Sequence, residues 1–121
     1  MKKEIDGMDD IHVLVDTFYE RVRKDELLAP IFNERIKDWG PHLETMYQFW
    51  QTLLLDQHTY RGAPFAKHLD LHIDNRHFDR WITLFHQTVD ENFSGMVADE
   101  AKFRAIKIAE VFRYKLDLLR F

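Results

Sequence analysis

The chain has seven histidines and no cysteine, so the histidines are the first side chains to consider as metal ligands. A neutral imidazole binds a metal ion when the ring is held rigidly and its second nitrogen is hydrogen-bonded. His68 is the best placed, since Gly62 and Pro64 break helix shortly before it and start a new turn. This pattern makes His68 a candidate metal ligand. A packed structural histidine beside Leu69 is the alternative.

His72 lies four residues after His68, so on a helix the two rings would share one face and would chelate a divalent ion. Two observations weaken a zinc-type site. Leu69 occupies the position of the glutamate in a His-Glu-x-x-His motif, and catalytic zinc sites usually have three protein ligands. A small metal-binding protein of this kind stays as an alternative without an obvious third ligand.

Three further polar side chains lie on apolar helix faces. A buried Tyr19 needs a partner for its hydroxyl, and Trp81 carries an N–H that acts only as a donor. His42 begins the apolar face of its helix, which is typical of a boundary residue with one ring edge in water. Core packing is an equally consistent role for Tyr19 and Trp81 on the pattern alone.

The spacing of apolar residues predicts four substantial helices and no strand. The first begins at Asp9 and Asp10, whose charges suit a helix N-terminus. Its apolar residues recur at helical spacing: Ile11, Leu14, Val15, Phe18, Tyr19 and Val22. Pro30 then prevents one long helix from running through the apolar corner of residues 27–32.

Three more helices follow. One starts at Pro41 and places Met46 on its apolar face; the next contains Phe78 to Val89, after a loop around Asp74 and Asn75. The last starts near Ala98. It is expected to carry these residues inward: Ala105, Ile108, Val111, Phe112, Leu116 and Leu119. The fold class is therefore all-α.

Composition sets limits on the function. The 121 residues predict a single domain, 1–121, and the net charge of −4 argues against nucleic acid as a partner. The absence of cysteine excludes disulfides, thiolate metal sites and covalent Cys-x-x-Cys-His haem attachment. No apolar run reaches the ~18 residues of a membrane span, and the first four residues lack a signal-peptide core. We therefore expect a cytoplasmic protein without membrane contact.

Several motifs occur together in an order that resembles the truncated haemoglobins, and within them group III. The proximal pattern is Gly62-x-Pro64-x-x-x-His68-x-x-Leu71, followed by His77-Phe78-x-x-Trp81-x-x-Leu84-Phe85. The distal pattern is Phe18-Tyr19-x-x-Val22, then Pro30-Ile31-Phe32, then His42 with Phe49-Trp50. The resemblance extends from Ile11 to Leu119. It implies a shortened globin fold, a two-over-two helical sandwich around non-covalent haem b.

The resemblance also implies roles for individual residues. His68 becomes the metal ligand on the proximal side of the haem, and Phe32 packs flat on the porphyrin. Tyr19 and Trp81 place hydrogen-bond donors over the bound ligand. His42 gates ligand entry or binds the iron as a sixth ligand. The expected catalytic residues are thus Tyr19, His42 and Trp81, and the expected cofactor-binding residues are Phe32, His42, Met46, His68 and Trp81.

The function implied is binding of O2, NO, CO and similar ligands, with NO detoxification or peroxide activation favoured over O2 transport. An unidentified reductase would be a partner, and a monomer is favoured. One departure concerns His72, which stands where the family tends to carry a proline and is therefore a rival ligand. Arg61 and Lys67 are candidates to hold the haem carboxylates. A cofactor-free helical interaction module, with the aromatic residues as its core, is the alternative from another class.

Overall fold

Five helices make up the part of the chain that the structure, a computed structural model, describes, namely residues 2–55 and 73–119. Apart from an isolated bridge between Lys3 and Phe93, no strand pairing occurs within these ranges. The predicted all-α class is confirmed. The helices are α1 (Met8–Val22), α2 (Ala29–Arg35), α3 (Trp39–Leu55), α4 (Asn75–Asn92) and α5 (Met96–Leu119).

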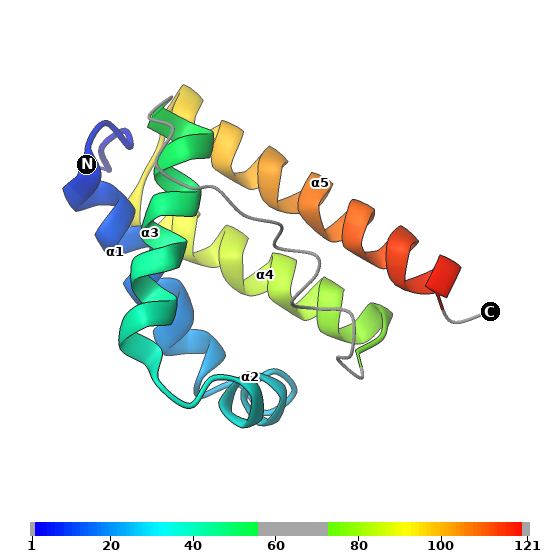
Figure 1. Cartoon of the computed structure of the whole chain (residues 1–121). Helices are drawn as coiled ribbons and strands as arrows, with labels where there is room; N and C mark the ends of the chain where they lie inside the picture. Colours follow the sequence, from blue (N-terminus) through cyan, green and yellow to red (C-terminus); the bar gives the residue numbers. More distant parts are fainter. Residues whose placement is uncertain (1, 56–72, 120–121) are drawn as a thin grey trace.

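The helices form two packed layers (Figure 1). In one layer α1 contacts α3, and in the other α4 runs beside α5 over most of its length. The layers meet where α1 packs on α4, with a smaller contact between α3 and α5. This arrangement is the two-over-two sandwich that the family resemblance implies. The short helix α2 lies at one end of the sandwich, between α1 and α3.

Helix α1 forms as its periodicity predicts and supplies much of the core. Asp9 and Asp10 lie in its first turn, and its apolar face is buried. Phe18 is 1% exposed and contacts Phe85 of α4 edge to face, with ring centroids 5.3 Å apart. Truncating such a buried ring costs about 3–5 kcal/mol. This packing fixes the orientation of α1 and thereby the position of Tyr19, the next residue.

Helix α2 is a seven-residue helix that the apolar periodicity does not predict, because the segment is too short to show a repeat. Pro30 lies in its first turn, where a missing N–H costs nothing. Helix α3 begins at Trp39, two residues before the predicted start at Pro41. The Asp38 carboxylate accepts a hydrogen bond from Gly40 N (3.2 Å) and caps this earlier start.

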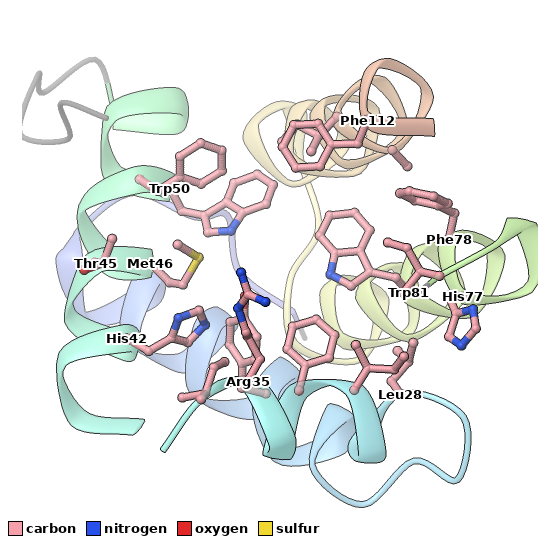
Figure 2. Close-up of a pocket in the computed structure, with 18 of the residues that line it drawn as sticks. Leu28, Arg35, His42, Thr45, Met46, Trp50, His77, Phe78, Trp81 and Phe112 are labelled. Atoms are coloured by element: carbon pink, nitrogen blue, oxygen red, sulfur yellow. The ribbon is translucent and has the colours of Figure 1, made fainter. Parts of the chain in front are cut away.

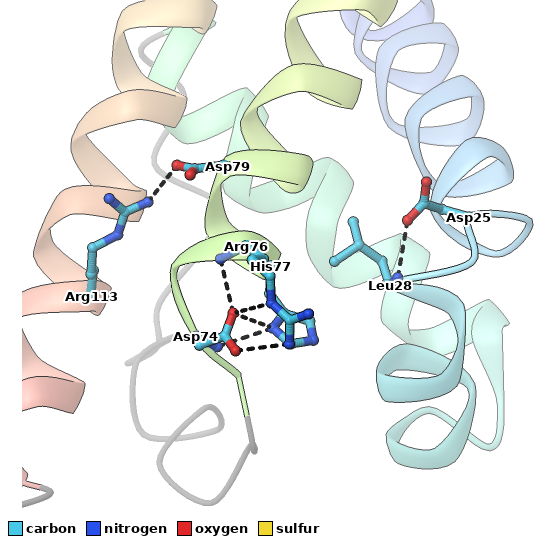
Figure 3. Close-up of polar contacts among 7 residues, drawn as sticks. All are labelled: Asp25, Leu28, Asp74, Arg76, His77, Asp79 and Arg113. Carbon is cyan, nitrogen blue, oxygen red and sulfur yellow. Dashed lines mark hydrogen bonds and ion pairs between the residues drawn. The ribbon is translucent and has the colours of Figure 1, made fainter.

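Helix α4 begins with a capping box, where the sequence predicts a loop. Asp74 accepts a hydrogen bond from Arg76 N (2.9 Å), and its own N–H donates to His77 Nδ1 (3.0 Å), as Figure 3 shows. Asn75 is therefore the first helical residue, and the sequence misses the cap because histidine replaces the usual Glu or Gln. The helix ends at Asn92.

Helix α5 begins at Met96, two residues before the predicted start, and one of its predicted core residues is wrong. Val111 is 46% exposed, whereas Ala105 and Leu116 are buried. At 3.6 residues per turn, Val111 lies about 120° around the helix from Ala105, so it cannot share the buried face. A face wide enough to include Val111 covers more of the helix surface than is buried.

The segment before α1 binds the start of α5 through Glu4. The Glu4 carboxylate accepts hydrogen bonds from Val97 N (3.0 Å) and Ala98 N (2.9 Å), and Ile5 is fully buried. Gly95 makes this approach possible. Its φ is +127°, and a Cβ there would lie 2.1 Å from a Glu4 carboxylate oxygen. Glu4 is therefore the N-terminal cap of α5, supplied from the far end of the sequence.

Glu4→Gln is expected to lower the free energy of unfolding by about 1–2 kcal/mol, the usual worth of a helix cap. Burial alone raises the pKa of Glu4, but the hydrogen bonds from Val97 N and Ala98 N outweigh it and lower the pKa. A carboxyl with a depressed folded-state pKa stabilises the fold above its unfolded pKa of about 4.3. That stabilisation is lost as the pH falls through the folded-state pKa.

Urea unfolding of wild type and Glu4→Gln near pH 7 and near pH 3 measures this effect. The difference between the two proteins should be smaller at the lower pH. Glu100→Gln, which removes only an exposed pair with Arg104, is the matched control. An equal loss of stability in Glu4→Gln and Glu100→Gln would mean that the cap contributes nothing.

Candidate functional site

A cavity of about 520 Å³ lies between the two layers, and all five helices contribute to its lining (Figure 2). Its volume is within the range of about 300–1,000 Å³ usual for small-molecule and cofactor sites. Most of the lining is apolar or aromatic. The aromatic residues among those that line it are Tyr19, Phe32, His42, Phe49, Trp50, His77, Phe78, Trp81 and Phe112. Such a cavity suits a large, flat and mainly apolar ligand.

Tyr19 reaches this cavity from α1, where it is 6% exposed. Its ring contacts Phe32 and His42 edge to face, with centroids 6.1 Å and 5.1 Å away. Its hydroxyl has no hydrogen-bond partner among residues 2–55 and 73–119. Burial raises the pKa of Tyr19, so the group is a protonated donor at neutral pH. A donor on a buried residue, without a partner among these residues, is suited to a ligand.

Trp81 is held in place by two fully buried rings. Its indole stacks on Phe85 at 5.8 Å and meets the edge of Phe18 at 5.6 Å. Phe85 in turn stacks on Trp50 of α3 at 4.8 Å. The indole nitrogens of Trp50 and Trp81 both face the inside of the cavity in Figure 2. The N–H of Trp81 is thus fixed in direction before any ligand arrives.

His42 and Met46 lie one turn apart on α3, and both line the cavity (Figure 2). The His42 ring is in contact with Tyr19 and with Trp39, whose centroid is 5.5 Å away. With Phe32 and Trp81, these residues complete the sequence-predicted site within the described chain: Tyr19, Phe32, His42, Met46 and Trp81 all line one cavity. His68 lies outside the described residues, as do the other proximal candidates, Arg61, Lys67 and His72.

Several lining residues were not predicted from the sequence. Arg35 and Lys37 stand at the edge of the cavity, and Figure 2 shows the Arg35 side chain extending into it. Trp50 belongs to a motif of the resemblance, but the motif gave no reason to place its indole in the cavity. Phe78 and Phe112 meet there from α4 and α5. The signal that could have identified Phe78 and Phe112 is their aromatic side chains on the apolar faces of two helices that face one another.

An ion pair next to the cavity joins the corner before α2 to α4. The Asp25 carboxylate accepts from Leu28 N (3.0 Å, Figure 3), Leu27 N (3.1 Å) and Arg80 Nε (2.6 Å). Burial alone raises the pKa of Asp25, but the Arg80 contact and the backbone bonds lower it. Leu28 lines the cavity, and Arg80 directly precedes Trp81. The pair therefore fixes two walls of the cavity relative to each other.

Two other kinds of site receive no support in the described part of the chain. Residues 2–55 and 73–119 contain no group of three His, Asp or Glu side chains close enough to hold a metal ion. Within the same ranges, no helix has both the length and the apolar character that a bilayer crossing requires.

A two-layer helical sandwich around an aromatic cavity lined by a tyrosine and a tryptophan is the architecture of a shortened globin. Comparison with known proteins agrees. The chain belongs to the bacterial-like globin family, which it matches over residues 3–114. Membership of the globins implies haem binding and, in general, small gaseous ligands such as O2.

Two curated relatives are truncated haemoglobins. Group 3 truncated hemoglobin ctb of Campylobacter jejuni is 35% identical over 121 residues, covering 96% of this chain and 95% of the relative. Group 2 truncated hemoglobin YjbI of Bacillus subtilis is 34% identical over 82 residues, covering 64% and 60%. The predicted resemblance to group III truncated haemoglobins is thus confirmed.

Two solved structures share the fold. The group III truncated hemoglobin from Campylobacter jejuni has a TM-score of 0.88 at 35% identity, covering 96% of this chain and 95% of that chain. The truncated oxygen-avid haemoglobin from Bacillus subtilis has a TM-score of 0.77 at 29% identity, covering 88% and 92%. The predicted globin architecture is therefore confirmed by structure as well as by sequence.

Proposed function

We propose that this globin binds haem b without a covalent link and holds O2 or NO for chemical conversion more than for transport. The observation that carries this proposal is Tyr19, a buried residue whose hydroxyl has no partner in the described chain and which lines the same cavity as Trp81. When bound, haem iron supplies a coordination position for O2, NO or CO and a capacity for electron transfer. The protein supplies the surroundings.

The residues present fit such a cofactor. The cavity has the volume and the aromatic lining that a flat apolar ring system requires. Phe32, Met46 and Phe112 would pack against the ring system, and His68, which lies outside the described residues, would be the metal ligand. Under this proposal His68 stays preferred over His72 because of its spacing from Gly62 and Pro64.

Tyr19 and Trp81 would act as a pair of donors to a partly anionic ligand. Hydrogen bonds to charged groups are worth about 1.5–3 kcal/mol each, roughly twice as much as neutral ones. Two such bonds slow ligand release, which makes a poor carrier and a good site for ligand chemistry. NO dioxygenation and peroxide activation are the reactions we propose. The second also needs a proton donor, a role that Tyr19 or His42 would fill.

The proposal includes the setting of the protein. We propose one cytoplasmic domain over residues 1–121, monomeric, that receives electrons from a separate reductase. The net charge of −4 gives no basis for a nucleic-acid partner.

Absorption spectra of the purified protein test the proposal. We expect a strong Soret band in the ferric form that shifts on reduction with dithionite and again on addition of CO. A colourless protein that stays folded and takes up no added haemin would end the haem proposal. The cofactor-free helical interaction module would then be the function to pursue.

Arg35 and Lys37 are further candidates to hold the two haem carboxylates, beside Arg61 and Lys67. Both line the cavity and both are exposed, so they mark its edge toward solvent. Exposed ion pairs are worth about 0.2–1 kcal/mol each. Replacing both with Gln should therefore speed haem loss roughly two- to thirtyfold, measured by transfer to an excess of apomyoglobin.

The dimethyl ester of haem provides the control, since it lacks free carboxylates. Its loss rate should be the same in wild type and in the Arg35→Gln, Lys37→Gln double variant. Arg104→Gln removes a cation from α5 that does not line the cavity, and it should leave both rates unchanged. Equal acceleration of haem and of its ester in the double variant would rule out carboxylate pairing.

A further inference from the structure

Trp39 does not line the cavity, yet it touches two of the polar residues that do. Its ring centroid is 5.7 Å from that of Tyr19 and 5.5 Å from that of His42, and its plane is perpendicular to the His42 ring. The His42 and Tyr19 rings are also perpendicular to each other. Such edge-to-face contacts are the favoured aromatic geometry and resist rotation of any one ring. The His42 ring is thus confined between two aromatic neighbours.

Arg23 completes this arrangement from the end of α1. Its guanidinium lies over the Trp39 ring, 4.5 Å from the centroid. Its backbone N–H donates to the carbonyl oxygen of Tyr19 (2.9 Å). One residue therefore contacts both neighbours of His42, one through its backbone and the other through its side chain. A cation over a tryptophan face is attracted by the ring quadrupole, so Arg23 favours the position that Trp39 occupies.

We propose that Arg23 and Trp39 form a clamp that positions the His42 ring inside the cavity and thereby sets the rate at which ligands enter. The proposal rests on the proposed function and on the role of ligand gate that the family resemblance implies for His42. Trp39 holds the ring against Tyr19, and Arg23 holds Trp39. Because Arg23 is exposed, its cation–π contact with Trp39 is a weak one, so the clamp tunes ligand entry without blocking it.

CO association with the haem-loaded protein, measured by stopped flow, tests the clamp. Arg23→Gln removes the cation and should raise the association rate roughly two- to fivefold, the effect of losing one exposed cation–π contact. Arg23→Lys keeps a cation over the ring and should restore most of the wild-type rate. Lys24→Gln is the matched control, because it removes the neighbouring positive charge, which pairs with Glu20 on the protein surface.

A double-variant comparison separates the clamp from a simple obstruction. If Arg23 acts through His42, Arg23→Gln should have no effect on CO association in a His42→Ala background. A full effect in that background would mean that Trp39 itself blocks entry, and the clamp would be overturned. An unchanged rate in Arg23→Gln alone would overturn it as well.

The ring-proton NMR resonances of His42 in the cofactor-free chain give a readout that does not depend on haem. They should move in Arg23→Gln and stay in place in Lys24→Gln, because of these two cations it is Arg23 that lies over the Trp39 ring. Unmoved resonances in Arg23→Gln would overturn the clamp. If the protein took up no haemin, the proposed function would fail, whereas these resonances would still decide whether Arg23 positions His42.

Discussion

Tyr19→Phe is expected to speed O2 release from the haem-loaded protein by about one to two decades, because it removes one donor from the ligand site. Each charge-assisted hydrogen bond is worth about 1.5–3 kcal/mol, and 1.4 kcal/mol corresponds to a factor of ten. Phe keeps the ring contacts with Phe32 and His42. Trp81→Phe removes the second donor and keeps an aromatic ring beside Phe85. Stopped-flow displacement of O2 by CO measures both rates.

The double variant should release O2 two to four decades faster than wild type if the two bonds act independently. Tyr114→Phe, which changes an exposed tyrosine on α5, should leave the rate unchanged. Burial raises the pKa of Tyr19, so its hydroxyl stays a donor and the wild-type rate should not depend on pH up to the ordinary tyrosine value of about 10. Unchanged release in both single variants would show that the pocket does not use these two donors.

His68→Gly is expected to abolish the wild-type haem spectrum, since it removes the proposed iron ligand. Added imidazole should restore a histidine-like spectrum by occupying the space of the lost side chain. His72→Gly, which removes the rival ligand, should keep the wild-type spectrum without imidazole. Rescue by imidazole in His72→Gly alone would assign the iron ligand to His72 and overturn the choice of His68.

The helices that the sequence predicts well are those with a long one-sided apolar repeat, such as α1 and α4. The sequence fails where a different signal decides the boundary. Helix α2 follows Pro30 over only seven residues, which is too short for a periodic pattern. The start of α4 depends on a histidine in the capping box. Whether Val111 is buried depends on how wide the buried face of α5 is.

The site shows a similar division between what the sequence predicts and what needs the fold. Tyr19, His42 and Trp81 are polar residues on apolar faces, so the sequence identifies them, and the structure gathers them around one cavity. Their roles stay predictions. Arg35 and Trp39 could not be selected in this way, because they lie in a segment where polar and apolar residues alternate without a clear pattern. Nothing in such a segment distinguishes a cation at the edge of a cavity, or an aromatic ring that packs behind it, from an ordinary surface residue. Only the packing of α2 and α3 against α1 gives them a position.

The contact between Glu4 and the start of α5 has a consequence for the order in which the protein folds. These hydrogen bonds join residues 93 and 94 positions apart in sequence. During synthesis the contact cannot form until the ribosome has released the chain beyond residue 98, by which time α1 and α3 have long been available to pair. Closing so long a loop also costs chain entropy. We therefore expect the contact between Glu4 and the start of α5 to form late in folding. We also expect it to be the first contact to open when the folded protein unfolds locally.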